Sequence, residues 1–232
     1  VWAILAGIIG ARLFHVIDFW NEIYGPNPTQ MFRIWQGGIS IYGAVLGGFA
    51  GGASYMWIRN HPMFLAFWAK LGGKPTEAPL PGIGALADIA APAVVLAMAV
   101  GRIGDIINGE HFANTTSLPW GFIYDHPATQ ALYARSGLNS LAPTHPAVVY
   151  EMLWDLVVFG IVWALGTRIR PPGMIFALFL ALYSGGKFFI SFLRLDNEWA
   201  LGLREAQYVA ILVMAITIPL LVLKAKIMRR SK

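Results

Sequence analysis

Six long segments of the chain are almost entirely apolar, and their hydrophobic residues run continuously instead of alternating with period two. Each is close to the roughly 20 residues that a helix needs to cross a bilayer core. Continuous runs do not fit the strands of a membrane barrel, which alternate. The pattern therefore predicts an all-α, polytopic transmembrane helix bundle, organised as a single integral membrane domain over 1–232. The predicted spans are 1–19, 38–58, 84–107, 146–167, 172–193 and 205–223.

Composition supports this class and excludes a soluble domain. Hydrophobic residues make up 57% of the chain and charged residues only 12%, whereas soluble domains carry about 25% charged residues. The chain contains no cysteine, so it supplies no disulfide or thiol chemistry of its own. The five histidines are scattered without metal-ligand spacing, and we expect neither a metal nor a cofactor.

The basic residues are distributed unequally between the two sets of connections, which indicates an orientation. By the positive-inside rule the richer set is cytoplasmic, so the C-terminus lies inside and the long loop 108–145 is extracytoplasmic. A nucleic-acid-binding tail at 224–232 is the rival interpretation, but an anchor at a membrane end explains the same charges, and we expect no nucleic-acid partner. The richer set comprises Arg59, Lys70, Lys74, Arg168, Arg170, Lys224, Lys226, Arg229, Arg230 and Lys232.

Several ionisable residues lie within the predicted spans, where charge is costly and usually faces a cavity or a partner. The basic ones are Arg12, Arg102 and Lys187. Structural ion pairs, such as Lys187 with Asp155, are the ordinary explanation, and a functional cavity is the alternative.

Polar residues concentrate in four short segments at the outer ends of the spans. Each has an ordinary structural explanation: a glycine-rich helix start, an Arg102–Asp105 ion pair, a helix cap and a snorkelling Arg194. Together they place two arginines, Arg102 and Arg194, at similar depth on one side. Guanidinium groups bind phosphate through paired hydrogen bonds, so we expect a cavity that binds an anionic phospholipid headgroup. The four segments contribute Ser40 and Tyr42; Arg102, Asp105, Asn108 and Glu110; Tyr150 and Glu151; and Arg194.

These segments resemble the phosphatidylglycerol–prolipoprotein diacylglyceryl transferases of bacteria. The family signature Gly-Arg-x-Gly-Asn-x-x-Asn-x-Glu is matched at 101–110, with Asp105 in place of the first Asn. Further matches in the same order are Gly10-Ala11-Arg12, Gly37-Gly38-x-Ser40, His145-Pro146 with Tyr150-Glu151, and Phe192-Leu193-Arg194 with Asp196. Members of that family have seven spans. Val1 lies inside an apolar run, so we expect the natural chain to begin earlier and to carry one further helix.

The resemblance implies a reaction, its partners and a location. The diacylglyceryl group of phosphatidylglycerol moves to the lipobox cysteine thiol of a prelipoprotein, a thioether forms and glycerol phosphate leaves. It implies contact with membrane lipid and with the prelipoprotein signal peptide, at the bacterial plasma (inner) membrane; it leaves the oligomeric state open. Arg102 and Arg194 are expected to stabilise charge on the leaving phosphate. The remaining implied substrate-binding residues are Arg12, Ser40, Asn108, Tyr150 and Glu151.

The thiol proton acceptor has more than one candidate, because Tyr42 stands where the family usually has His. Tyrosine has an unperturbed pKa of about 10 and is a poor base unless a nearby arginine lowers that value. Asp105 and Glu110 are the other candidates. Two alternatives in other classes stay open: a catalytically inactive lipid-binding subunit of a membrane complex, and a small-solute transporter. A transporter predicts a broken helix or an internal repeat, and the sequence shows neither.

Overall fold

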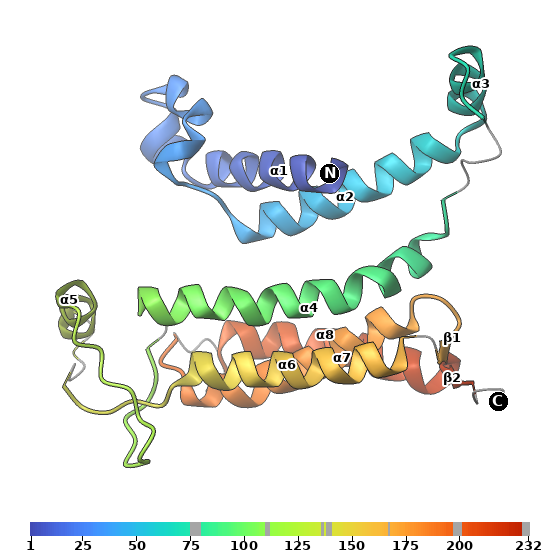
Figure 1. The fold of residues 1–232 in the computed structure, drawn as a ribbon. Coiled ribbons are helices and arrows are strands. Elements are labelled where there is room, and N and C mark those ends of the chain that lie inside the picture. Colours follow the sequence, from blue (N-terminus) through green and yellow to red (C-terminus); the bar gives the residue numbers. More distant parts are fainter. Residues whose placement is uncertain are drawn as a thin grey trace. The chain divides into compact units, whose positions relative to one another are not determined.

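The computed structural model describes residues 1–74, 80–109, 112–135, 137, 141–166, 168–196 and 201–228. The chain separates into two compact units, Val1–Ile83 and Gly84–Lys232, which Figure 1 colours from blue to teal and from green to red. The single membrane domain expected for 1–232 stays a prediction.

The first unit is built on two long helices joined by short irregular turns. Helix α1 (Trp2–Asp18) and helix α2 (Ile41–Asn60) pack against each other (Figure 1). Between them, the chain makes a π-helical turn and two 3-10 turns. A short helix α3 follows α2 inside a segment that was expected to be a plain connection. The shorter elements are Trp20–Tyr24, Pro28–Phe32, Ile34–Gln36 and α3 (Pro62–Lys70).

Small residues bring α1 and α2 close together. Gly43, Gly47 and Gly51 are spaced one helical turn apart on α2, and they face Ala6 and Gly10 of α1. A methyl group added at Gly47 would lie 2.5 Å from the carbonyl oxygen of Ala6. Such a stripe permits the backbone approach on which helix association in membranes depends, so the glycines of 38–58 have a packing role.

The second unit contains four long helices and a long connection with its own short helix. Figure 1 shows α4, α6, α7 and α8 running side by side. Two residues after α6 pair with two residues after α8 as a minimal antiparallel sheet, Ile169 opposite Ile227 and Arg170 opposite Lys226. The elements are α4 (Ile83–Asn108), α5 (Pro127–Arg135), α6 (Ala147–Leu165), β1 (Ile169–Arg170), α7 (Met174–Ile190), a 3-10 turn (Ser191–Leu193), α8 (Glu205–Lys224) and β2 (Lys226–Ile227).

The core of the second unit is formed by branched aliphatic and aromatic side chains from three helices. Ala91 and Val95 of α4, Val158 and Val162 of α6, and Ile175 of α7 are fully buried. Polar groups at the far end of this core are also satisfied, because the Asp88 carboxylate accepts hydrogen bonds from the backbone N–H groups of Gly173 (2.7 Å) and Phe176 (2.9 Å). Asp88 therefore caps the start of α7.

Each of the six predicted spans coincides with a helix of the structure. Among the described residues, four helices are long and apolar enough to cross a membrane: α4, α6, α7 with its 3-10 extension to Leu193, and α8. Helix α1 has 17 residues, and α2 carries five glycines, which lower its hydrophobicity. The chain is therefore helical with four membrane-spanning candidates, and six spans stay a prediction.

Candidate functional site

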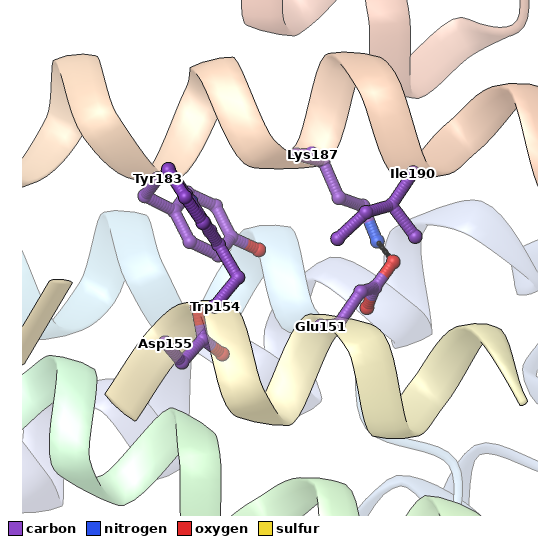
Figure 2. A pocket seen from close by; sticks show the side chains of 6 residues that line it. All are labelled: Glu151, Trp154, Asp155, Tyr183, Lys187 and Ile190. Atoms are coloured by element: carbon purple, nitrogen blue, oxygen red, sulfur yellow. Dashed lines mark hydrogen bonds and ion pairs between the residues drawn. The ribbon is translucent and has the colours of Figure 1, made fainter. Parts of the chain in front are cut away.

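A single buried carboxylate, Glu151 of α6, collects three positively charged side chains. Its Oε2 lies 2.5 Å from Nη2 of Arg102, and its Oε1 lies 2.7 Å from Nζ of Lys187 and 3.4 Å from Nη1 of Arg194. The Glu151 side chain is only 4% exposed. Figure 2 shows Glu151 and Lys187 facing each other from α6 and α7. The structure thus brings Arg102 and Arg194, which are 92 positions apart in sequence, onto one partner.

Each of the two arginines also pairs with a second carboxylate nearer to solvent. Nη1 of Arg102 lies 3.0 Å from Oδ2 of Asp105, one turn further along α4. Nε and Nη2 of Arg194 lie 2.8 and 3.1 Å from the two oxygens of Asp196. Both arginines are therefore already paired with carboxylates, so an anion that binds either guanidinium competes with Glu151, Asp105 or Asp196.

Arg194 is held in place by the long connection between α4 and α6. The backbones of Ala113 and Arg194 form an isolated antiparallel β-bridge. On either side of this bridge, the N–H of Asn114 donates to the carbonyl of Leu193 (2.8 Å), and the N–H of Leu195 donates to the carbonyl of Phe112 (3.0 Å). The extracytoplasmic loop expected at 108–145 thus supplies the strand-like support for the second arginine.

The same connection has a small core of its own. Tyr133 of α5 is 2% exposed, and its ring meets that of Phe112 edge-on, with centroids 4.2 Å apart. Burial raises the pKa of the Tyr133 hydroxyl above its ordinary value. The loop is therefore a packed structural element that can position residues 112–114 against 193–195.

Arg204 fixes the chain on the other side of Arg194. Its Nη1 donates to the carbonyl of Ser191 (2.9 Å) and its Nε to the carbonyl of Asp196 (3.2 Å). It is 7% exposed. No sequence motif indicates a role for Arg204, because these contacts form only when α8 folds back against the end of α7.

Tyr150 lies at the edge of the cluster, one position before Glu151. Its hydroxyl accepts a hydrogen bond from the indole N–H of Trp120 (2.8 Å) and lies 3.5 Å from Nδ1 of His145. Tyr150, the polar residue predicted at the start of α6, therefore lies in a contact between the loop and α6. Its role in substrate binding stays a prediction.

Arg12, in the first unit, has a different environment. Its five N–H donors contact five backbone carbonyl oxygens, so the guanidinium organises the turn between α1 and α2. A ring of Tyr24 lies 5.3 Å from its central carbon. The carbonyls belong to Gln30, Met31, Arg33, Gly37 and Gly38, at 2.6–3.4 Å.

Four other predicted site residues are placed as follows. Ser40 precedes α2, and its N–H donates to the carbonyl of Ala11 (3.0 Å). Asn108 ends α4 and is exposed. Tyr42 lies in the first turn of α2, but its side chain is outside the described part of the chain, and Glu110 is outside the described residues altogether. The structure therefore brings together Arg102, Asp105, Glu151 and Arg194 from the predicted set.

The expected Lys187–Asp155 pair is not what the structure contains. Lys187 pairs with Glu151, one helical turn earlier on α6. Asp155 is 1% exposed, and its Oδ2 has no hydrogen-bond partner among the described residues. It lines a narrow gap together with Glu151, Trp154, Tyr183, Lys187 and Ile190 (Figure 2). This gap leaves no room for a bound small molecule.

Comparison with known proteins gives one consistent result. A family model described as prolipoprotein diacylglyceryl transferase matches residues 1–72 and 80–223. A phosphatidylglycerol–prolipoprotein diacylglyceryl transferase of Dehalococcoides mccartyi is 31% identical over 97% of this chain and 75% of the relative. Proteins of that name from Paenarthrobacter aurescens (36% identical) and, as transferase 2, from Streptomyces coelicolor (34%) each align with 97% of this chain, covering 68% and 64% of their own length.

Proposed function

The chain belongs to the prolipoprotein diacylglyceryl transferase family, and from this premise we infer that it transfers the diacylglyceryl group of phosphatidylglycerol to the lipobox cysteine thiol of prelipoproteins. The observation that carries the assignment to this site is the convergence of Arg102 and Arg194 on Glu151. Two guanidinium groups held a short distance apart in a largely apolar helix bundle provide the donors that a phosphate group needs.

The reaction exchanges one bond for another. The substrate sulfur, as thiolate, attacks the terminal glyceryl carbon and forms the C–S bond. The C–O bond to phosphate breaks, and its electron pair stays on the departing glycerol phosphate. The phosphate gains one negative charge in this step. Arg102 and Arg194 stabilise that charge, and because it develops in the transition state their contribution accelerates the reaction.

The proton of the thiol goes to a base at the same site. Tyr42, Asp105 and Glu110 are the proposed acceptors. Asp105 is the one whose side chain the structure describes, and it lies beside Arg102. A base in this position removes the proton from the nucleophile while the adjacent guanidinium receives the leaving group, which is the division of labour that general-base catalysis requires.

The apolar helices indicate where the reaction takes place. We place the protein in the bacterial inner membrane, with six spans in this chain, the cluster toward the outer surface and the C-terminus in the cytoplasm. The lipid reaches the cluster sideways from the bilayer, and the tethered signal peptide approaches from the same side. Arg12, Ser40, Asn108, Tyr150 and Glu151 complete the proposed substrate-binding set.

Separate substitutions Arg102→Ala and Arg194→Ala test the assignment. With phosphatidylglycerol vesicles and a lipobox peptide, each is expected to lower kcat by about 10²-fold or more, as loss of one donor to a developing oxyanion does elsewhere. Arg168→Ala, an exposed arginine at the other end of α6, is the matched control. If both buried variants kept full activity, the phosphate-binding role would be wrong. A wild-type chain that yields no thioether would favour the inactive lipid-binding relative.

A further inference from the structure

The carboxylates around the two arginines differ sharply in exposure. Glu151, shared by both arginines, is 4% exposed in its side chain, whereas Asp105 is 29% and Asp196 is 42% exposed. Burial and three cationic partners make Glu151 hard to displace, since removing one partner of a buried ion pair is strongly unfavourable. Of the three carboxylates, Asp196 is the one that water can best solvate when its ion pair opens, while the buried Arg194 guanidinium needs a replacement anion. Asp196 is therefore the most readily displaced anion of the cluster.

The Asp196 carboxylate lies along one edge of the Arg194 guanidinium. Nη2 donates a hydrogen bond to Oδ1 (3.1 Å), and Nε lies 2.8 Å from Oδ2 as an ion pair. A phosphate group can present two oxygens to such an edge. The third donor group, Nη1, points to Glu151. The edge that faces Asp196 is thus the part of Arg194 available for exchange.

We propose that the Asp196 carboxylate occupies on Arg194 the position that the substrate phosphate takes, and that the two anions exchange during each catalytic cycle. This rests on the proposed function, because it assumes that Arg194 binds the lipid phosphate. Exchange keeps this edge of the Arg194 guanidinium paired with an anion when the monoanionic phosphodiester of the lipid enters. When the product leaves, Asp196 returns to the guanidinium and competes with glycerol phosphate for it.

The surrounding contacts allow Asp196 to move without Arg194. The backbone of Arg194 is fixed by its bridge to Ala113, and its Nη1 stays with Glu151. The backbone carbonyl of Asp196 is held by Arg204. A rotation of the Asp196 side chain therefore suffices, and both the arginine and the main chain remain where they are.

Asp196→Asn tests the exchange, because the amide keeps the shape and removes the competing charge. With the full chain in nanodiscs, we expect KM for phosphatidylglycerol to fall about two- to fivefold, the range expected when a competing carboxylate that is itself exposed is removed, without a rise in kcat. The inhibition constants of added glycerol phosphate and inorganic phosphate are expected to fall by a similar factor. Asp125→Asn, an equal charge change at an exposed loop residue, is expected to alter neither.

A second variant separates exchange from simple support of Arg194. Asp196→Glu retains the charge, so it is expected to return KM and both inhibition constants toward wild-type values. Unchanged or raised KM in Asp196→Asn, or equal effects of Asp196→Asn and Asp125→Asn, would overturn the proposal. If neither inhibition constant changed in Asp196→Asn, recognition of phosphate at Arg194 would be contradicted as well.

The two proposals fail in distinguishable ways. Absence of transfer by the wild-type chain would count against the proposed function. The exchange is still tested there by direct titration, in which inorganic phosphate raises the thermal unfolding temperature. Asp196→Asn is expected to reach half of this effect at a lower phosphate concentration than wild type, and an identical titration in both proteins would overturn the exchange.

Discussion

Arg12 in the first unit and Arg194 in the second are both buried arginines near the end of an apolar helix, yet their partners are of opposite kinds. Arg12 donates all five N–H groups to backbone carbonyls. Arg194 faces two carboxylates, one buried and one exposed. A carbonyl belongs to the main chain and cannot be exchanged for a ligand without unfolding a turn. A carboxylate side chain can rotate away, so Arg194 can bind another anion while the fold persists.

The comparison shows why residue type alone does not identify a binding arginine. Both Arg12 and Arg194 belong to motifs that resemble the transferase family. The groups that each guanidinium contacts distinguish an arginine that shapes a loop from one that can bind a phosphate. The following changes test this division between the two units.

The largest effect is expected from Glu151→Leu, since it leaves Arg102, Lys187 and Arg194 without their shared counter-charge. Removing one partner of a buried ion pair costs about 3–5 kcal/mol, so the thermal unfolding temperature in detergent should fall steeply. Glu151→Gln should lose less, because the amide oxygen still accepts hydrogen bonds. The exposed Glu22 provides the control Glu22→Leu. Equal unfolding temperatures for Glu151→Leu and wild type would show that the cations do not depend on Glu151.

A somewhat smaller loss is expected from Arg12→Met, which leaves five carbonyl groups without their charged donor. A hydrogen bond to a charged group contributes about 1.5–3 kcal/mol, and water can replace part of this set, so a total near 2–4 kcal/mol is expected. Hydrogen exchange should accelerate within 28–38. Arg12→Lys, with three donors in place of five, should recover only part. Arg33→Met, an exposed neighbour, is the control, and unaltered exchange in Arg12→Met would contradict the loop-shaping role.

Gly47→Ala tests the backbone packing of the first unit. The added methyl would lie 2.5 Å from the carbonyl oxygen of Ala6 and 3.0 Å from Cα of Gly10, so the helices have to separate. Overpacking of this kind costs about 1–3 kcal/mol, measured by chemical or thermal unfolding. Gly52→Ala on the same helix meets only the Ala3 methyl at 3.9 Å. Destabilisation of equal size at both positions would indicate a general effect of replacing glycine in this helix and would contradict a local clash at Gly47.

The smallest effect is expected from Asp88→Ala, which removes the cap of α7. Loss of such a cap costs about 1 kcal/mol. Asp88→Asn keeps one acceptor oxygen for Gly173 or Phe176 and should cost less. Hydrogen exchange at 173–176 measures the change locally, and protection that persists in Asp88→Ala would mean that other groups satisfy these N–H donors. Asp88 shows that the second unit also contains a charged side chain that binds the backbone, as Arg12 does in the first unit.

Sequence reasoning located most of the helices and part of the site. Long uncharged runs sufficed for the six helices, since period and length leave few alternatives. It did not foresee α3 or α5, which are nine residues each and lie in segments of mixed composition. It selected Lys187 as a costly intramembrane charge but paired it with Asp155. Glu151 and Asp155 are one helical turn apart on α6, so spacing alone does not distinguish them.

The role of Arg204 was invisible for a different reason. Its contacts with the backbone of Ser191 and Asp196 form only after helix α8 folds back against the end of α7. A chain of residues specifies helices through local forces, but ion pairs between distant segments depend on where those helices come together.

The amino-acid sequence by itself determined the helical membrane class, the expected orientation and the family motifs, because these follow from apolar length, charge placement and residue identity. Tertiary structure decided which charges meet. It gave Arg12 to main-chain carbonyls and gathered Arg102, Lys187 and Arg194 around Glu151. The physical reason is that the buried Glu151 pairs with the cations that the packed helices bring beside it, and these cations lie far away along the chain.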